Sequence, residues 1–85
     1  MTDKIIDLIN KNFKQNNRET VVEQLLTIKL EHVWNGPINL LNTRHSILKL
    51  ANGNIDEVIY FTKCAKVDFR DVIMWAGEKE GKENK

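Results

Sequence analysis

Residues 47–59 read ILKLANGNIDEVI, and this stretch predicts where one helix ends and the next begins. Gly53 tolerates the left-handed backbone conformation that often closes a helix. Asn54 is followed three residues later by Glu57, which is the spacing of a capping box at the start of a new helix. The stretch therefore predicts a helix that ends at Ala51 and another that begins at Ile55.

Outward from this junction, apolar residues recur every three or four positions, as they do on one face of a helix. Breaks are predicted at Asn16-Asn17 and Gly36-Pro37, and Asn17 and Asp68 are predicted N-caps. No segment shows the alternation of a strand. The fold class is therefore all-α, a compact bundle of about five short helices that span Thr2 to Lys14, Arg18 to Trp34, Ile38 to Ala51, Ile55 to Ala65 and Phe69 to Ala76.

A chain of 85 residues has room for one hydrophobic core. We expect residues 1–76 to form the helical domain. The last nine residues, GEKEGKENK, contain only charged residues, Gly and Asn. Residues 77–85 are therefore predicted to be a charged, flexible C-terminal tail.

The overall composition makes some classes of function and location less expected than others. With 13 Lys and Arg against 12 Asp and Glu, the net charge is +1, so no global field favours binding to DNA or RNA. Cys64 is the only cysteine, and no apolar segment at the N-terminus precedes a cleavage site, so a cytoplasmic location is expected. No apolar run approaches the roughly 20 residues that cross a bilayer, and no membrane partner is predicted.

The residues that carry catalysis or bind metals are scattered. His32, His45 and Cys64 fall on three predicted helices without the paired spacing of zinc ligands. The only serine, Ser46, follows His45 directly, and adjacent helical residues point apart. We therefore predict no enzymatic activity, no cofactor and no metal site.

The features that remain favour contacts with another protein. Ile28 and Leu30 lie off the main apolar stripe of the predicted helix 18–34, which indicates apolar surface on more than one face. Tryptophan is enriched at the centres of protein interfaces. The predicted interaction surface comprises Trp34, Tyr60, Arg70, Met74 and Trp75, and the predicted partner is another protein or a second copy of this chain. The stretch from His32 to Ile55, which contains no acidic residue, is predicted to be either a mildly basic binding face or an ordinary solvated one.

Sequence-specific DNA binding is the alternative prediction. Residues 55–76 place two helices around a short turn, as a helix-turn-helix does. Tyr60, Ala65 and Val72 occupy plausible core positions of such a pair. However, the would-be recognition helix begins with Asp68 and Asp71, whose carboxylates would face phosphates, so nucleic acid ranks below protein as a partner.

The second half of the chain also resembles a group of small uncharacterised bacterial proteins that carry an LKLA.G segment followed by A..D(Y/F)RDV..WA. The matching residues here are LKLANG at 48–53 and AKVDFRDVIMWA at 65–76. The resemblance implies a bacterial, cytosolic origin and no activity. It also draws attention to Arg70 and Asp71, and we expect Asp68 to cap the last helix while Arg70 or Arg44 pairs with a carboxylate across helices, for example Arg44 with Asp71.

Overall fold

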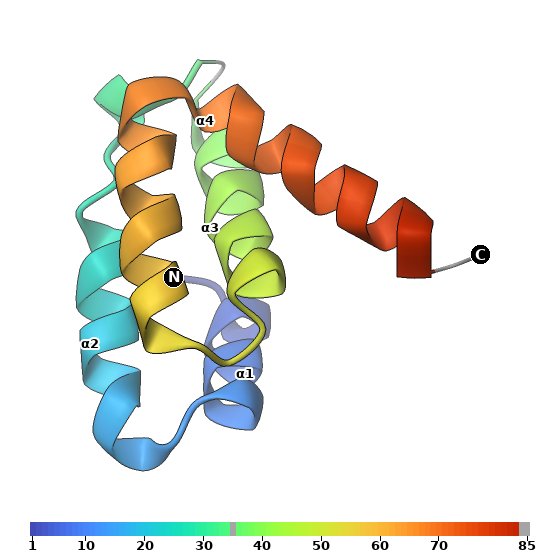
Figure 1. The fold of residues 1–85 in the computed structure, drawn as a ribbon. Coiled ribbons are helices and arrows are strands. Elements are labelled where there is room, and N and C mark those ends of the chain that lie inside the picture. Colours follow the sequence, from blue (N-terminus) through green and yellow to red (C-terminus); the bar gives the residue numbers. More distant parts are fainter. Residues whose placement is uncertain (35, 84–85) are drawn as a thin grey trace.

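The computed structural model describes residues 1–34 and 36–83, and it confirms the all-α fold class (Figure 1). Within those residues there is no strand. The elements are α1 (Asp3–Asn12), α2 (Gln15–Leu26), the short 3-10 helix η1 (Leu30–His32), α3 (Pro37–Ala51) and α4 (Ile55–Glu83). Asn35 and residues 84–85 of the predicted tail lie outside the described residues.

The first two helices meet at a tighter corner than the sequence predicts. Thr2 caps α1 by accepting a hydrogen bond from the Ile5 amide at 3.4 Å, but the helix ends at Asn12 rather than Lys14. Because α2 already begins at Gln15, the predicted N-cap at Asn17 is wrong. Arg18 closes the corner from α2, since its guanidinium donates to the carbonyl oxygens of Phe13 and Asn10 at 3.0 and 2.8 Å.

The prediction that the second helix reaches Trp34 is also wrong, because α2 ends at Leu26. The Gln24 carbonyl oxygen accepts from both the Thr27 hydroxyl at 2.6 Å and the Thr27 amide at 3.1 Å, so Thr27 satisfies that oxygen without a further helical turn. Ile28 is 0% exposed and belongs to the core rather than to a second apolar face of α2. The apolar surplus expected from a long second helix is therefore partly absorbed into the core.

The junction between α3 and α4 follows the prediction closely. Pro37 is the first residue of α3, where its fixed φ suits a helix start. Asn52 at φ 47° is the left-handed cap, followed by Gly53 at φ 87°. The Asn54 Oδ1 atom accepts from the Glu57 amide at 3.2 Å, and α4 begins at Ile55 as predicted.

Helix α4 has two halves, residues 55–67 and 69–83, on either side of Asp68. Asp68 has non-helical backbone angles of φ −154° and ψ 100°, which confirms the predicted break. Its Oδ1 atom accepts from the Arg70 amide at 3.1 Å and so caps the second half. The second half continues to Glu83, so the predicted helix end at Ala76 is wrong. Figure 1 shows this half leaving the bundle at an angle.

The core lies where α2, α3 and the first half of α4 run side by side, with α1 packed against α2 and α3 (Figure 1). Its fully buried side chains are mainly aliphatic, and the largest are Ile5, Ile9, Leu25, Ile28, Ile47 and Leu48. Cys64 is half-buried and free. In the described part of the chain, no helix is long and apolar enough to cross a membrane.

Candidate interaction surface

Most of the exposed large hydrophobic side chains gather at one end of the bundle. At this end α2 finishes, η1 and the following loop lead into α3, and α4 kinks (Figure 1). Such a concentration is typical of a surface that meets another molecule. The residues concerned are Leu26, Leu30, Trp34, Ile38, Val67 and Met74.

A groove of about 360 Å³ runs between the loop before α3 and the second half of α4. We call it the end groove. It brings together three of the five residues that the sequence singled out, Trp34, Arg70 and Met74. The residues that complete its lining are Asn39, Phe69 and Ile73.

Trp34 is held in place although its ring is largely open to solvent. Its side chain is 62% exposed, whereas Phe69 beneath it is 5% exposed. The two rings meet edge to face, with centroids 6.3 Å apart and an interplanar angle of 73°. The Asn39 Nδ2 atom donates to the Trp34 carbonyl oxygen at 2.6 Å, which ties the backbone at this position to the first turn of α3. The indole is therefore positioned in advance of any partner.

Arg70 also lines this groove, where its guanidinium lies over the Trp34 ring, and it is itself fixed by Asp68. Its Nε and Nη2 atoms donate to the two carboxylate oxygens of Asp68 at 3.0 and 2.9 Å. This bidentate pair lowers the pKa of Asp68, chiefly through the side-chain hydrogen bond. Because Asp68 also caps the helix, one carboxylate both starts the second half of α4 and orients the guanidinium.

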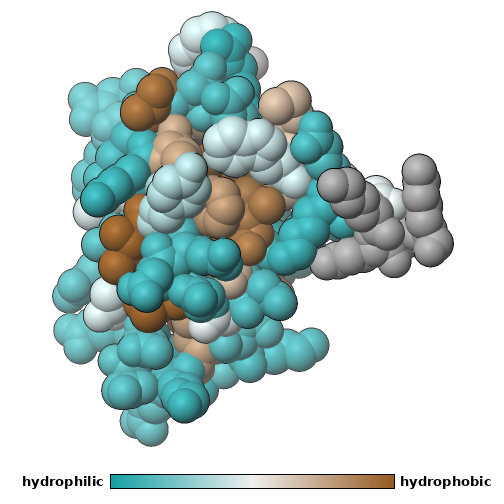
Figure 2. Space-filling view, viewed as in Figure 1, coloured by the Kyte–Doolittle hydropathy of each residue, from teal (hydrophilic) through white to brown (hydrophobic). Residues whose placement is uncertain are grey.

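Tyr60 and Trp75 lie elsewhere, around Phe61. The Phe61 ring centroid is 5.1 Å from that of Tyr60 and 6.2 Å from that of Trp75. Tyr60 is 58% exposed and Trp75 is half-buried. In Figure 2, apolar and aromatic side chains gather on the face between the two halves of α4. The five predicted residues therefore fall into two groups, one in the end groove and one on this aromatic face.

Three residues of the end groove were not singled out from the sequence. Phe69 and Ile73 follow the apolar spacing of the last helix, and this spacing does not distinguish a residue that only faces the core from one that also lines a groove. Asn39 has no sequence signature at all, because its role depends on the path of the loop before it.

Arg44 does not form the predicted pair with Asp71. Its Nε and Nη2 atoms instead donate to the carbonyl oxygens of Leu25 and Ile28 at 3.1 and 3.0 Å, where α2 ends. Arg70 pairs with Asp68 on its own helix rather than across helices. Arg44 is thus the residue that holds the segment after α2 against α3, and it contributes little to any basic face of residues 32–55.

The two histidines lie in different parts of the fold and make different contacts. The Nδ1 atom of His32 accepts from the Lys29 amide at 2.9 Å and so closes η1. His45 lines a separate pocket between α1 and α3. Among the described residues, no group of three or more His, Cys, Asp or Glu side chains is arranged to hold a metal ion.

No protein family, curated protein or solved structure matches this chain.

Proposed function

We propose that this chain is a non-enzymatic helical domain that acts through protein contacts at the end groove, most simply in a homodimer. The observation that carries the proposal is Trp34, an indole that is 62% exposed yet fixed by contacts to Phe69, Arg70 and Asn39. A rigid, exposed tryptophan beside a groove is a common anchor of protein interfaces, because little conformational entropy is lost when it is covered. We further propose a bacterial cytoplasmic setting.

The exposed side chains at this site are suited to an interface. Trp34 is 62% exposed, and covering its apolar surface removes that surface from water, which favours association. Met74 is 52% exposed on the opposite edge and adds a flexible apolar contact. The paired charges of Asp68 and Arg70 stand at the rim, which matches the usual arrangement of an apolar interface centre and a polar edge.

DNA binding through residues 55–76 remains the second candidate, and the geometry does not favour it. Arg70, the cation at the start of the second half of α4, is already engaged by Asp68. Asp68 and Asp71 stand beside it, and their carboxylates would repel phosphates.

Sedimentation equilibrium of the whole chain at micromolar concentration, with two matched variants, tests the proposal. The wild type is expected to sediment above its monomer mass of 9.9 kDa. Trp34→Ala is expected to shift it to the monomer. Tyr60→Ala removes an equally exposed aromatic outside the end groove and is expected to leave the assembly unchanged. Circular dichroism should show both variants folded.

A wild type that remains a monomer at all concentrations would refute the homodimer. Co-purification from the native host with the same two variants would then decide whether a different protein uses the groove. Loss of a captured protein with Trp34→Ala but not with Tyr60→Ala is expected. If adding a DNA duplex at low salt shifts the resonances of residues 66–76, DNA binding replaces protein binding as the function.

A further inference from the structure

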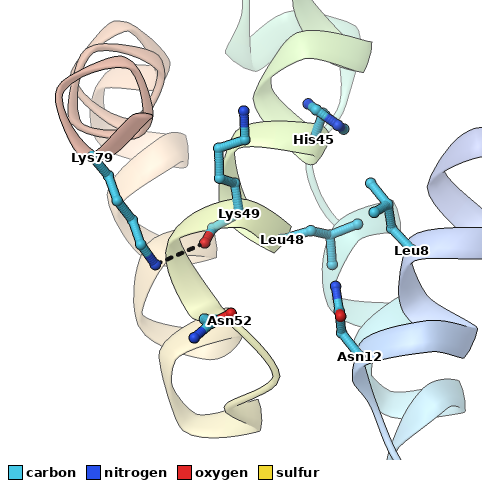
Figure 3. A pocket seen from close by; sticks show the side chains of 7 residues that line it. All are labelled: Leu8, Asn12, His45, Leu48, Lys49, Asn52 and Lys79. Carbon is cyan, nitrogen blue, oxygen red and sulfur yellow. Dashed lines mark hydrogen bonds between the residues drawn. The ribbon is translucent and has the colours of Figure 1, made fainter. Parts of the chain in front are cut away.

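A second pocket, of about 190 Å³, lies between α1, α3 and the second half of α4 (Figure 3). Its apolar floor is made by Leu8 and Leu48, whose side chains point toward one another. His45 and Lys49 stand above this floor on α3, and Lys79 reaches toward it from α4. This pocket is distinct from the end groove and shares no residue with it.

The charged groups that line the pocket are all basic. Lys49 and Lys79 contribute ammonium groups to the lining, and no acidic residue does. The pKa of His45 is lowered by burial first and then by the ammonium groups of Lys49 and Lys4, while Glu80 acts in the opposite direction. An anion bound here would relieve this repulsion between cations.

The carbonyl groups at the C-terminal end of α3 also carry partial negative charge near these cations. The Lys79 Nζ atom already donates to one of them, the Lys49 carbonyl oxygen, at 3.1 Å (Figure 3). The Lys49 side chain, in contrast, forms its ion pair with Glu80, whose side chain is 54% exposed. Lys49 therefore already binds a carboxylate, and that carboxylate is free to turn toward solvent.

We propose that this pocket binds a small carboxylate with a short apolar chain. The carboxylate would take the place of Glu80 at Lys49, near His45, and the chain would lie on Leu8 and Leu48. The pocket is smaller than the sites that hold drug-sized ligands, so the proposed ligand is small. The side chains of Asn12 and Asn52 complete the lining of the pocket.

The role of Glu80 as an internal competitor makes the proposal sharp. Removing its charge with Glu80→Gln should free Lys49 and tighten binding. Removing the cation with Lys49→Met should weaken binding. Lys66→Met is the matched control, since Lys66 is an exposed lysine outside the pocket.

The experiment is an NMR titration of the whole chain with butyrate, a small carboxylate with a short apolar chain. Saturable shifts at His45, Asn52 and Leu48 are expected, together with a rise in the pKa of His45. The dissociation constant is expected to fall about twofold or more in Glu80→Gln, to rise about fivefold in Lys49→Met and to stay unchanged in Lys66→Met.

Three results would overturn the proposal. The first is no shift with butyrate beyond that of sodium chloride at the same ionic strength. The second is an equal response to inorganic phosphate, which would show an unspecific anion effect without a role for the apolar floor. The third is an unchanged dissociation constant in both Glu80→Gln and Lys49→Met.

Discussion

The guanidinium carbon of Arg70 lies 4.4 Å from the centre of the Trp34 ring. This cation–π contact joins the loop before α3 to the second half of α4, two segments that are distant in the sequence. Because Asp68 holds the same guanidinium by two hydrogen bonds, the kink of α4 and the position of the indole depend on each other.

Replacing Arg70 with Met should therefore loosen Trp34 without unfolding the chain. Both the cation–π contact and the pair with Asp68 are lost, so the Trp34 indole is expected to show greater motion by NMR relaxation. The pKa of Asp68 should rise toward its ordinary value, because its largest lowering influence is the hydrogen bond from Arg70. Unchanged relaxation at Trp34 would show that Phe69 and Asn39 alone position the ring.

Arg44→Met should destabilise the fold more than Arg44→Lys. The Ile28 carbonyl oxygen loses its side-chain donor and the Leu25 carbonyl oxygen keeps only the Ile28 amide, which is expected to cost about 1 to 2 kcal/mol since the site is only partly closed to solvent. Lysine keeps one charged donor and should recover part of the loss. Urea unfolding measures the difference, and equal midpoints for the two variants would contradict this role.

Thr62→Val should stabilise the protein. Thr62 is 1% exposed, and within the described residues its Oγ1 atom has no hydrogen-bond partner. Removing this hydroxyl is expected to raise the free energy of unfolding by about 1 kcal/mol. Thr43→Val is the matched control, because the Thr43 hydroxyl is equally buried but donates to the Asn39 carbonyl at 2.7 Å. The melting temperature should rise for Thr62→Val and fall for Thr43→Val.

Gly77→Ala should also stabilise the fold, by about 0.5 to 1 kcal/mol, since alanine restricts the unfolded chain and favours the helix. A Cβ atom at position 77 meets nothing within 4 Å. Gly53→Ala should have the opposite effect, because its Cβ would lie 2.8 Å from the Asn12 carbonyl oxygen and its φ is +87°. If Gly77→Ala leaves the melting temperature unchanged, the helix does not extend through residue 77 in solution.

The stability of the protein should decrease as the pH falls through the ordinary pKa of histidine. The pKa of His45 is lower in the folded state than its usual 6.5, so the unfolded chain takes up a proton first. The contribution of His45 to the free energy of unfolding is constant above the ordinary pKa, decreases as the pH falls, and becomes constant again below the pKa of His45 in the folded state. His45→Gln should remove this part of the pH dependence in urea titrations at several pH values, and a slope that persists would assign it to another group.

Short-range patterns predicted the parts of the fold that short-range contacts build. Asn54 caps α4, Pro37 starts α3 and Asp68 breaks α4, and in each case the determining groups lie within a few residues of one another. Two of the incorrect helix ends have long-range causes. Helix α2 stops at Leu26 where Arg44 donates to the Leu25 and Ile28 carbonyl oxygens, and residues 77–83 are helical where Lys79 and Glu80 contact Lys49.

The candidate surface also depends partly on the sequence and partly on long-range contacts. The sequence predicted the types of residue on it, because aromatic and basic residues off the apolar stripe of a helix are not needed for the core. Which of them meet was decided only by the kink at Asp68 and by the loop before α3, which bring Arg70 over Trp34 and leave Tyr60 and Trp75 on another face. By itself the sequence determined the all-α class and the helix boundaries at Pro37, Asn54 and Asp68, since these rest on local hydrogen bonds and periodicity. The tertiary structure decided the groove and the pocket, since each is formed by side chains that only packing brings together.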